Sequence, residues 1–498
     1  MSAILGAGHR PVKRERQVRS RAVRTTFYGP VVPFAAESSH ARMHPFLILL
    51  IGMVVILGAI IVLKMNAFLA LLGAAIVVSF LAPGDPTLRI TRVAEAFGRT
   101  TGHVGIVIAL AAIVGAAMTQ SGAADRIVTA FLNVLGQKRD AVALSATAFV
   151  LSLPVFFDTV FFLLAPLARS MYARTNRNYL KYLVAMSASG VATHTLVPPH
   201  PGPLGVADTL SIDLGMMILI GVVVAIPGAI VGYAFATWID RRMPVPMRVR
   251  PGDEHQTPQT ESLPGLIPSL IPVVGPVALI ASGTIVEALR TWMPSQAALW
   301  NSIRPVTTVI GNPVLAMLLA AGAALLLYAK QRRPSTEQMG AVVETAIMGA
   351  GVVIVIVAAG GAFGAMLQAA GIGPAVQAMF VGAGSDRGYT FLLLAFGITT
   401  VLKVAQGSST VAMITAAGMV GAMVQGLALP YHTVYLGTAI AAGSLIGSWM
   451  NDAGFWVFSK IGGVTEVEAL RSWSPLLVIV GVTSFLTTLV MATLVPMR

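Results

Sequence analysis

The stretch THTLVPPHPGP, residues 193–203, decides how the chain can fold. It places four prolines and two histidines in the middle of an otherwise apolar segment. Proline has no amide hydrogen and its ring clashes with the preceding helical turn, so an α-helix cannot run through this stretch. The sequence therefore predicts a helix that is interrupted here.

The surroundings of this stretch are those of a membrane protein. Hydrophobic residues make up 56% of the 498 residues and charged residues only 11%, whereas soluble domains carry roughly 25% charge. Apolar runs long enough for a bilayer recur, and we expect about ten to fourteen crossings or part-crossings. The clearest runs are 46–63, 214–239, 264–287, 312–329, 346–368 and 474–494. We predict an all-α polytopic protein of the bacterial cytoplasmic membrane.

The basic residues lie mostly between these runs. The formal charge is +13, and its main clusters are 169–181, 241–250 and 330–333. This pattern is typical of cytoplasmic loops under the positive-inside rule and argues against a nucleic-acid partner. The chain has no cysteine, so disulfides and thiolate chemistry are excluded.

Two halves of the chain match each other at an offset of 249 residues. GAAMTQSGAADRIVTAF (115–131) lies over GAMLQAAGIGPAVQAMF (364–380), with both glycines, one alanine and the final phenylalanine in common. The same offset pairs the interruptions: PVFFD (154–158) with KVAQG (403–407), and PPHPG (198–202) with the segment around 448–451. Paired interruptions in two halves point to a transporter binding site near the bilayer midplane.

Loop charges predict that the halves have opposite topology. With the basic loops on the cytoplasmic side, PVFFD enters the membrane from the inside and QGSST (406–410) from the outside. We divide the chain into a basic extension at 1–42, a first transmembrane repeat at 43–239, a cytoplasmic linker at 240–263 and a second repeat at 264–498.

Residues 1–42 are strongly basic and have no apolar signal-peptide core. Inversion places Met43 outside, where a basic tail would break the positive-inside rule. We therefore interpret 1–42 as upstream sequence read from a start codon placed too early. A cytosolic basic tail is the other interpretation, and a missed crossing within 67–118 would remove the conflict.

Asp158 stands alone among aromatic and aliphatic residues in LPVFFDTVFFLLAPL (153–167). Removal from water favours the neutral form of a carboxylate, so Asp158 is a candidate proton carrier. A permanently protonated or lysine-paired structural aspartate is the competing interpretation. We favour the proton-coupling role.

The stretch KVAQGSSTVAMITAAG (403–418) contains a turn of small polar residues that opens a helix. Unpaired amides and the helix dipole at such a start favour an anion. Gly407 lets a ligand approach the backbone closely. Small-residue helix packing explains the same pattern equally well. The candidate ligand-binding residues here are Gln406, Gly407, Ser408, Ser409 and Thr410.

The stretch GSWMNDAGFW (447–456) places Asn451 and Asp452 in an apolar run. Together they can accept hydrogen bonds from hydroxyl groups, and Asp452 can also take a proton or coordinate Na⁺. A structural ion pair between Asp452 and Lys403 is the competing explanation. We favour a ligand or coupling role, because intramembrane ionisable groups are functional by default.

The histidines of the opening stretch, His194 and His200, can titrate in the physiological range. A single histidine is more often a hydrogen-bonded structural residue than a proton relay, so the prolines carry more weight. They free carbonyl groups and force an extended segment, which suits a helix break that lines a substrate cavity.

Motifs of soluble enzymes are absent from the sequence. There is no nucleophile elbow, Walker loop or H-E-x-x-H zinc motif, so we expect neither an enzyme nor ATP-driven transport, and no cofactor or metal.

Four segments together resemble the gluconate:proton symporter family, also called the gluconate permease family. They are LPVFFDTVFFLLAPL, HTLVPPHPGP, VAQGSSTVAMITAAG and NDAGFWVF, in the family's order, within a likeness that runs from about Met43 to the C-terminus. Some relatives carry Glu at the position of Asp158 and Arg at that of Lys403. The resemblance implies two inverted repeats, each with a re-entrant hairpin and a broken helix, that move in an elevator-like way. It also implies import of gluconate, idonate, fructuronate, glycerate or D-serine, and a homodimer is a further expectation.

We therefore expect symport of a sugar acid with H⁺. The amides and hydroxyls of Gln406 to Thr410 are expected to hold the carboxylate, while Asn451, Asp452, Thr195 and His200 contact the polyol. Pro199 is a further substrate-binding candidate. Asp158 is the first candidate for the coupling proton, Asp452 the second and His194 the third. The alternatives are Na⁺ coupling, a D-serine or glycerate substrate, and a passive anion channel.

Overall fold

The computed structural model describes residues 43–135, 140–248, 263–380, 388–450 and 452–497. Met43–Arg498 forms one compact unit, separate from Met1–Arg42. Every regular element in the described ranges is helical, which agrees with the all-α prediction.

The helices of the first half differ widely in length, and a π-helical turn, η1 (Gly58–Val62), and a 3₁₀ turn, η2 (Pro86–Leu88), lie among them. In chain order they are α1 (Pro45–Leu57), α2 (Ala67–Leu81), α3 (Arg89–Ser121), α4 (Ala123–Leu135), α5 (Asp140–Leu151), α6 (Phe157–Thr175), α7 (Tyr179–Leu196), α8 (Pro201–Thr209) and α9 (Leu214–Arg242).

The second half continues the same mixture of long and short helices, with a 3₁₀ turn, η5 (Pro294–Gln296). Its helices are α10 (Leu266–Trp292), α11 (Ala297–Ile310), α12 (Pro313–Arg332), α13 (Thr336–Ala369), α14 (Ile372–Phe380), α15 (Thr390–Gln406), α16 (Ser409–Val424), α17 (Val434–Gly443), α18 (Ala453–Gly462) and α19 (Glu466–Leu494).

Six helical stretches of the described chain are long and apolar enough to cross a membrane. Five coincide with expected runs, whereas the run at 46–63 is divided into the short helix α1 and the turn η1. The sixth, Pro86–Ser121, is absent from our expected runs. Arg89, Arg92, Glu95 and Arg99 give its first half a polar composition that hides the apolar second half. Most of it lies in the 67–118 window where we considered a missed crossing.

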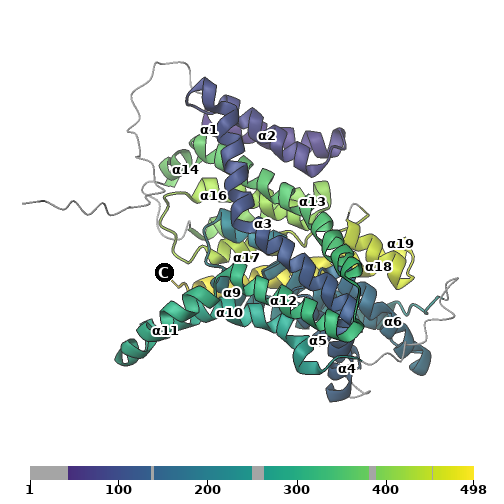
Figure 1. The fold of residues 1–498 in the computed structure, drawn as a ribbon. Coiled ribbons are helices and arrows are strands. Elements are labelled where there is room, and N and C mark those ends of the chain that lie inside the picture. The colour runs from purple at the N-terminus through teal and green to yellow at the C-terminus, as the bar shows by residue number, and fades with distance from the viewer. Residues whose placement is uncertain (1–42, 136–139, 249–262, 381–387, 451, 498) are drawn as a thin grey trace, which may run out of the picture. The chain divides into compact units, whose positions relative to one another are not determined.

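The most buried helices are not the longest ones. Every residue of α17 and most residues of α7 and α16 are buried, as expected for helices that are apolar on all sides and surrounded by protein. The long helices α9, α12 and α19 instead leave large apolar side chains exposed, among them Ile230, Leu326 and Val490. This is the arrangement expected when a bilayer, and not water, covers the outer surface. Figure 1 shows α13 lying along α3, and the two helices are packed together.

Two helices stop partway and resume after a break. The helix α7 ends at Leu196 and α8 begins at Pro201, after the segment Val197–His200, in which the Pro198–Pro199 peptide bond is cis. The prolines of the opening stretch therefore interrupt a helix as predicted. Likewise, α17 ends at Gly443 and α18 begins at Ala453.

The first break is packed tightly against α9. A Cβ atom added at Gly221 of α9 would lie 2.3 Å from the carbonyl oxygen of Leu196 and 3.5 Å from the Cα of Val197. Only glycine leaves room for this approach of backbone to backbone. The close contact holds the end of α7 in place.

Candidate functional site

Four helices begin at one cavity of about 410 Å³ inside the compact unit. They are α6, α8, α16 and α18, and their first residues line it. The N-terminus of a helix presents unpaired amide groups and a positive end of the helix dipole. The cavity therefore has a backbone suited to an anion.

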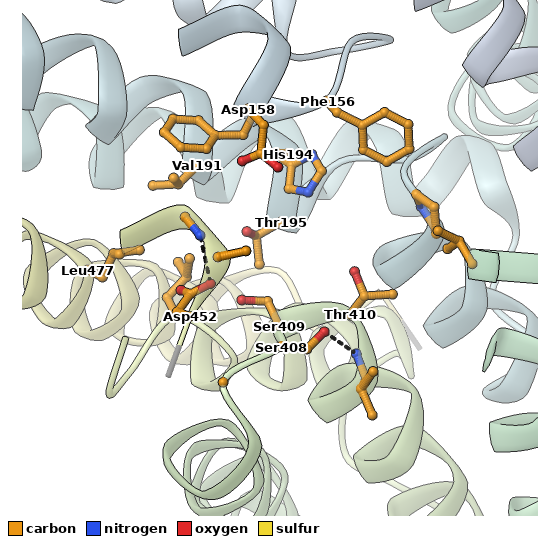
Figure 2. A pocket seen from close by; sticks show the side chains of 18 of the residues that line it. Phe156, Asp158, Val191, His194, Thr195, Ser408, Ser409, Thr410, Asp452 and Leu477 are labelled. Carbon is orange, nitrogen blue, oxygen red and sulfur yellow. Dashed lines mark hydrogen bonds between the residues drawn. The ribbon is translucent and has the colours of Figure 1, made fainter. Parts of the chain in front are cut away.

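One wall carries Asp158, His194 and Thr195 (Figure 2). Asp158 lies in the first turn of α6, and the other two residues lie in the last turn of α7, next to the proline break. The carboxylate of Asp158 is exposed to the cavity. Within the ranges that the structure describes, no side chain forms an ion pair with it.

The opposite wall carries Ser408, Ser409 and Thr410, which Figure 2 shows across the cavity from Thr195. Gly407 ends α15 in the left-handed conformation, with φ of 84°, and so allows the chain to turn sharply into α16. The Oγ of Ser408 accepts a hydrogen bond from the amide of Val411 at 3.3 Å, which caps α16.

The other two hydroxyl groups of this wall differ in their bonding. Ser409 donates its hydroxyl to the carbonyl of Ser444 at 2.9 Å and thereby ties the start of α16 to the second break. The side chain of Thr410 lines the cavity and is labelled in Figure 2. A ligand can therefore meet the start of α16 through Thr410 and the backbone.

Asp452 lies at the start of α18 and carries several hydrogen bonds at once. Its Oδ1 accepts the amide of Gly454 at 3.0 Å, and its Oδ2 accepts the ammonium of Lys403 at 2.8 Å and the hydroxyl of Ser448. Lys403 also donates to the carbonyl of Gly407. The side chain of Lys403 is 1% exposed and that of Asp452 15% exposed, so the pair lies at the edge of the cavity with the lysine behind.

The ion pair that we considered as the structural alternative for Asp452 is thus present, and Asp452 also lines the cavity. The two interpretations are compatible in this geometry. The pair joins the end of α15 to the start of α18.

Trp473 of α19 supports this arrangement from behind. Its indole N–H donates to the Oγ of Ser448 at 2.7 Å, and its ring lies 5.5 Å from the ring of Phe157 and 5.4 Å from that of Phe458. Trp473 is buried, yet it forms part of the cavity lining.

Sequence reasoning did not single out Trp473 or the apolar lining. Two examples are Val353 and Ile356 of α13, whose apolar environment within a long helix gives no local signal. The other apolar side chains that line the cavity are Phe156, Phe157, Val191, Pro201, Val411, Leu445, Ala453 and Leu477.

Several predicted residues lie elsewhere. Pro199 and His200 are not among the residues that line the cavity. His200 is buried and its Nε2 donates to the carbonyl oxygen of Ser152 at 2.6 Å, while its ring lies 4.1 Å from that of His194. It braces the break from behind. Asn451 and the side chain of Gln406 lie outside the described residues.

The site can hold a small anion that carries hydroxyl groups. It combines hydroxyls, carboxylates and helix starts with apolar walls, and in the described ranges no group of three or more His, Cys, Asp or Glu side chains is placed to hold a metal ion. Broken membrane helices that meet at a polar cavity are the architecture of multi-pass membrane transporters.

The comparison with known families agrees with the class of multi-pass membrane transporters and identifies the family within it. The profile of the GntP family permeases matches residues 44–495. The chain therefore belongs to the GntP permease family, a family of membrane permeases and not of enzymes.

Relatives in other bacteria are similar over nearly their whole length. The inner membrane permease YgbN of Escherichia coli is 34% identical, over 89% of this chain and 97% of its own. The gluconate permease of Pseudomonas aeruginosa is 31% identical, over 88% and 96%. The L-idonate transporter of the Gnt-II system of E. coli is 30% identical, over 86% and 95%. Membership confirms the resemblance seen in the four motifs, as well as the multi-pass location in the cell membrane.

A solved structure shares the fold at low sequence identity. The YdaH transporter of Alcanivorax borkumensis aligns with a TM-score of 0.59 at 15% identity, over 91% of this chain and 99% of that one. The likeness shows that the two chains share a fold.

Proposed function

We propose that this permease imports gluconate or a related sugar acid by symport with H⁺. The observation that carries the proposal is the cavity at which four helices begin, because it combines an anion-favouring backbone with a carboxylate, Asp158, that faces the ligand space. Relatives named as gluconate permeases and an L-idonate transporter support the sugar-acid class.

The substrate carboxylate is proposed to lie at the start of α16. The backbone there turns at Gly407, and the groups of Ser408, Ser409 and Thr410 surround the helix start, with Gln406 as a further candidate. The start of α18 is capped by the carboxylate of Asp452, which would repel a second carboxylate, whereas the start of α16 is capped by the neutral hydroxyl of Ser408, so α16 is the better place for the substrate carboxylate. Charge-assisted hydrogen bonds from helix amides are among the stronger ones.

The polyol end is proposed to face Asp452 and Thr195, which line the cavity on opposite walls. Carboxylate and hydroxyl oxygens accept hydrogen bonds from sugar hydroxyl groups. Asn451, Pro199 and His200 stay candidates, and the bonding of His200 to Ser152 suits an indirect role in shaping the break.

Asp158 is proposed to bind the coupling proton. A substrate anion that enters beside an ionised Asp158 meets a like charge in a site with apolar walls, and one proton on Asp158 removes this repulsion. Anion and proton binding therefore favour each other. Asp452 and His194 are the second and third candidates.

The two inverted repeats are part of the same proposal. The order of helices from α3 to α9 matches that from α13 to α19, including the break between α7 and α8 and that between α17 and α18. In each half a short turn also joins two helices, α5 to α6 and α15 to α16, and both this turn and the start of the helix that follows it line the cavity. These two turns fit the tips of re-entrant hairpins.

The test is uptake of labelled gluconate by proteoliposomes with the pH gradient and the Na⁺ gradient imposed separately. An inward proton gradient alone should drive accumulation above the external concentration. Accumulation that requires Na⁺ would support the Na⁺-coupled alternative. Conductance that neither saturates nor depends on a gradient would support a passive channel. Competition by idonate, glycerate and D-serine then ranks the substrates.

A further inference from the structure

We infer that the Lys403–Asp452 pair is a fixed, electrically neutral unit, so that each cycle carries one proton with one monocarboxylate and moves no net charge. The inference rests on the proposed function and adds its stoichiometry. It separates the role of Asp452 from that of Asp158.

The pair is held from several directions. Lys403 bonds to Asp452 at 2.8 Å and also to the carbonyl of Gly407, so its ammonium bridges two segments. Ser448 donates to the same carboxylate and in turn accepts the indole N–H of Trp473 at 2.7 Å. Trp473 acts through Ser448 and is a positioning residue.

Separation of this pair is costly inside the protein. Lys403 is 1% exposed, and a buried charge that loses its partner is strongly destabilising. A cycle in which Asp452 left Lys403 to accept a proton would leave the ammonium without its counter-charge. The pair therefore moves through the cycle together.

The two histidines do not add to the number of protons carried with each gluconate. His200 donates its Nε2 hydrogen to the carbonyl of Ser152, and the ring of His194 lies 4.1 Å away, where two cationic rings would repel each other. The Nδ1 of His194 is buried and has no hydrogen-bond partner in the described ranges, so a protonated His194 ring would be a buried cation without an acceptor for that hydrogen. The titratable groups that line the cavity or stand directly behind it in the described ranges are Asp158, His194, His200, Lys403 and Asp452. Once the pair and the histidines are set aside, Asp158 is the group that binds one proton per cycle.

The charge balance follows directly. One monocarboxylate anion and one proton enter together with a summed charge of zero, and Asp158 returns in its ionised form. A membrane potential does no work on such a cycle. If Asp452 accepted a second proton, one positive charge would enter per cycle, and a potential of 100 mV would raise the accumulation ratio about fiftyfold.

The experiment uses the full chain in proteoliposomes with labelled gluconate, a pH-sensitive dye and a potassium diffusion potential. The wild-type protein is expected to take up one proton per gluconate. A pH gradient should drive accumulation, and an inside-negative potential without a pH gradient should leave the accumulation ratio at one.

Two variants test the pair itself. K403Q leaves Asp452 without its cation and is expected to lose most uptake. The double variant K403Q/D452N removes both charges and is expected to regain pH-driven uptake with a raised KM, still at one proton per gluconate and still without a response to potential.

The matched serine variants test how the pair is held. S448A removes the hydroxyl between Trp473 and Asp452, and we expect KM to rise about tenfold, as for one charge-assisted hydrogen bond. S187A removes a buried hydroxyl of α7 that bonds to the carbonyl of Leu183 and does not line the cavity, and it should leave KM unchanged.

The outcomes separate the two proposals. Two protons per gluconate, or accumulation driven by the potential alone in the wild type, would overturn the fixed pair and leave H⁺ symport standing. Uptake of gluconate without proton movement would contradict the proposed H⁺ symport, and the inference about the Lys403–Asp452 pair with it. The wild-type measurement decides even if a variant fails to insert.

Discussion

The substitution G221A tests how tightly α9 holds the proline break. The added methyl carbon would lie 2.3 Å from the carbonyl oxygen of Leu196, whereas carbon and oxygen atoms normally stay about 3.3–3.6 Å apart. The methyl carbon is fixed directly to the backbone of α9 and the oxygen belongs to the backbone of α7, so α9 and the end of α7 must separate by roughly 1 Å. Overpacking of this kind costs about 1–3 kcal/mol.

Two opposing effects make the result informative. Alanine stabilises a helix interior by about 0.5–1 kcal/mol relative to glycine, so a site with free space should gain stability. G322A in α12 is the matched control, because no atom lies within 4 Å of the added methyl group there. We expect G221A to lower the free energy of unfolding by about 1–3 kcal/mol and G322A to raise it slightly.

The assay is unfolding of the purified protein in mixed micelles by increasing SDS, followed by tryptophan fluorescence. Uptake measured in parallel should show a raised KM for G221A, because Thr195 of the cavity wall directly precedes Leu196. If G221A proves as stable as the wild type while G322A behaves as expected, α9 does not hold the break as we describe.

Three further predictions concern the site and its surroundings. D158N should abolish gradient-driven accumulation of gluconate and keep exchange across the membrane, which counterflow assays measure; unchanged accumulation would remove Asp158 from the coupling role. T410V should raise the KM for gluconate tenfold or more with little change in maximal rate, since a hydrogen bond to a charged ligand contributes about 1.5–3 kcal/mol; an unaltered KM would place the carboxylate elsewhere. G407A should lower the free energy of unfolding by about 1–2 kcal/mol, because the φ of Gly407, 84°, is left-handed. G407N should lower it by less, because asparagine tolerates that conformation; equal unfolding curves for both variants and the wild type would contradict this.

The breaks could be predicted from the sequence because their causes are local. Prolines at 198, 199, 201 and 203 cannot continue a helix, and a polar cluster such as QGSST is costly inside an apolar run unless it lines a cavity. The possible pairing of Lys403 with Asp452 could also be foreseen, because two opposite charges in apolar segments tend to meet. The structure places them 2.8 Å apart.

The rest depends on contacts between distant segments. The sequence does not show that Trp473 of α19 reaches Ser448, or that His200 turns to the carbonyl of Ser152 and away from the cavity. The long helix α3 was missed as a span because its charged first half obscures the apolar remainder. Periodicity and composition report each segment alone, whereas these features arise when segments pack together.

The helix starts at the cavity have a consequence for how substrate choice can change over time. Peptide groups at the start of α16 supply the attraction for a negative charge under our proposal, and peptide groups are neither titrated by pH nor removed by replacing a side chain. Side chains that face the polyol, such as Thr195, are then free to vary with the shape of the sugar. A permease built in this way can change the acid that it carries by single substitutions, while its demand for a carboxylate persists.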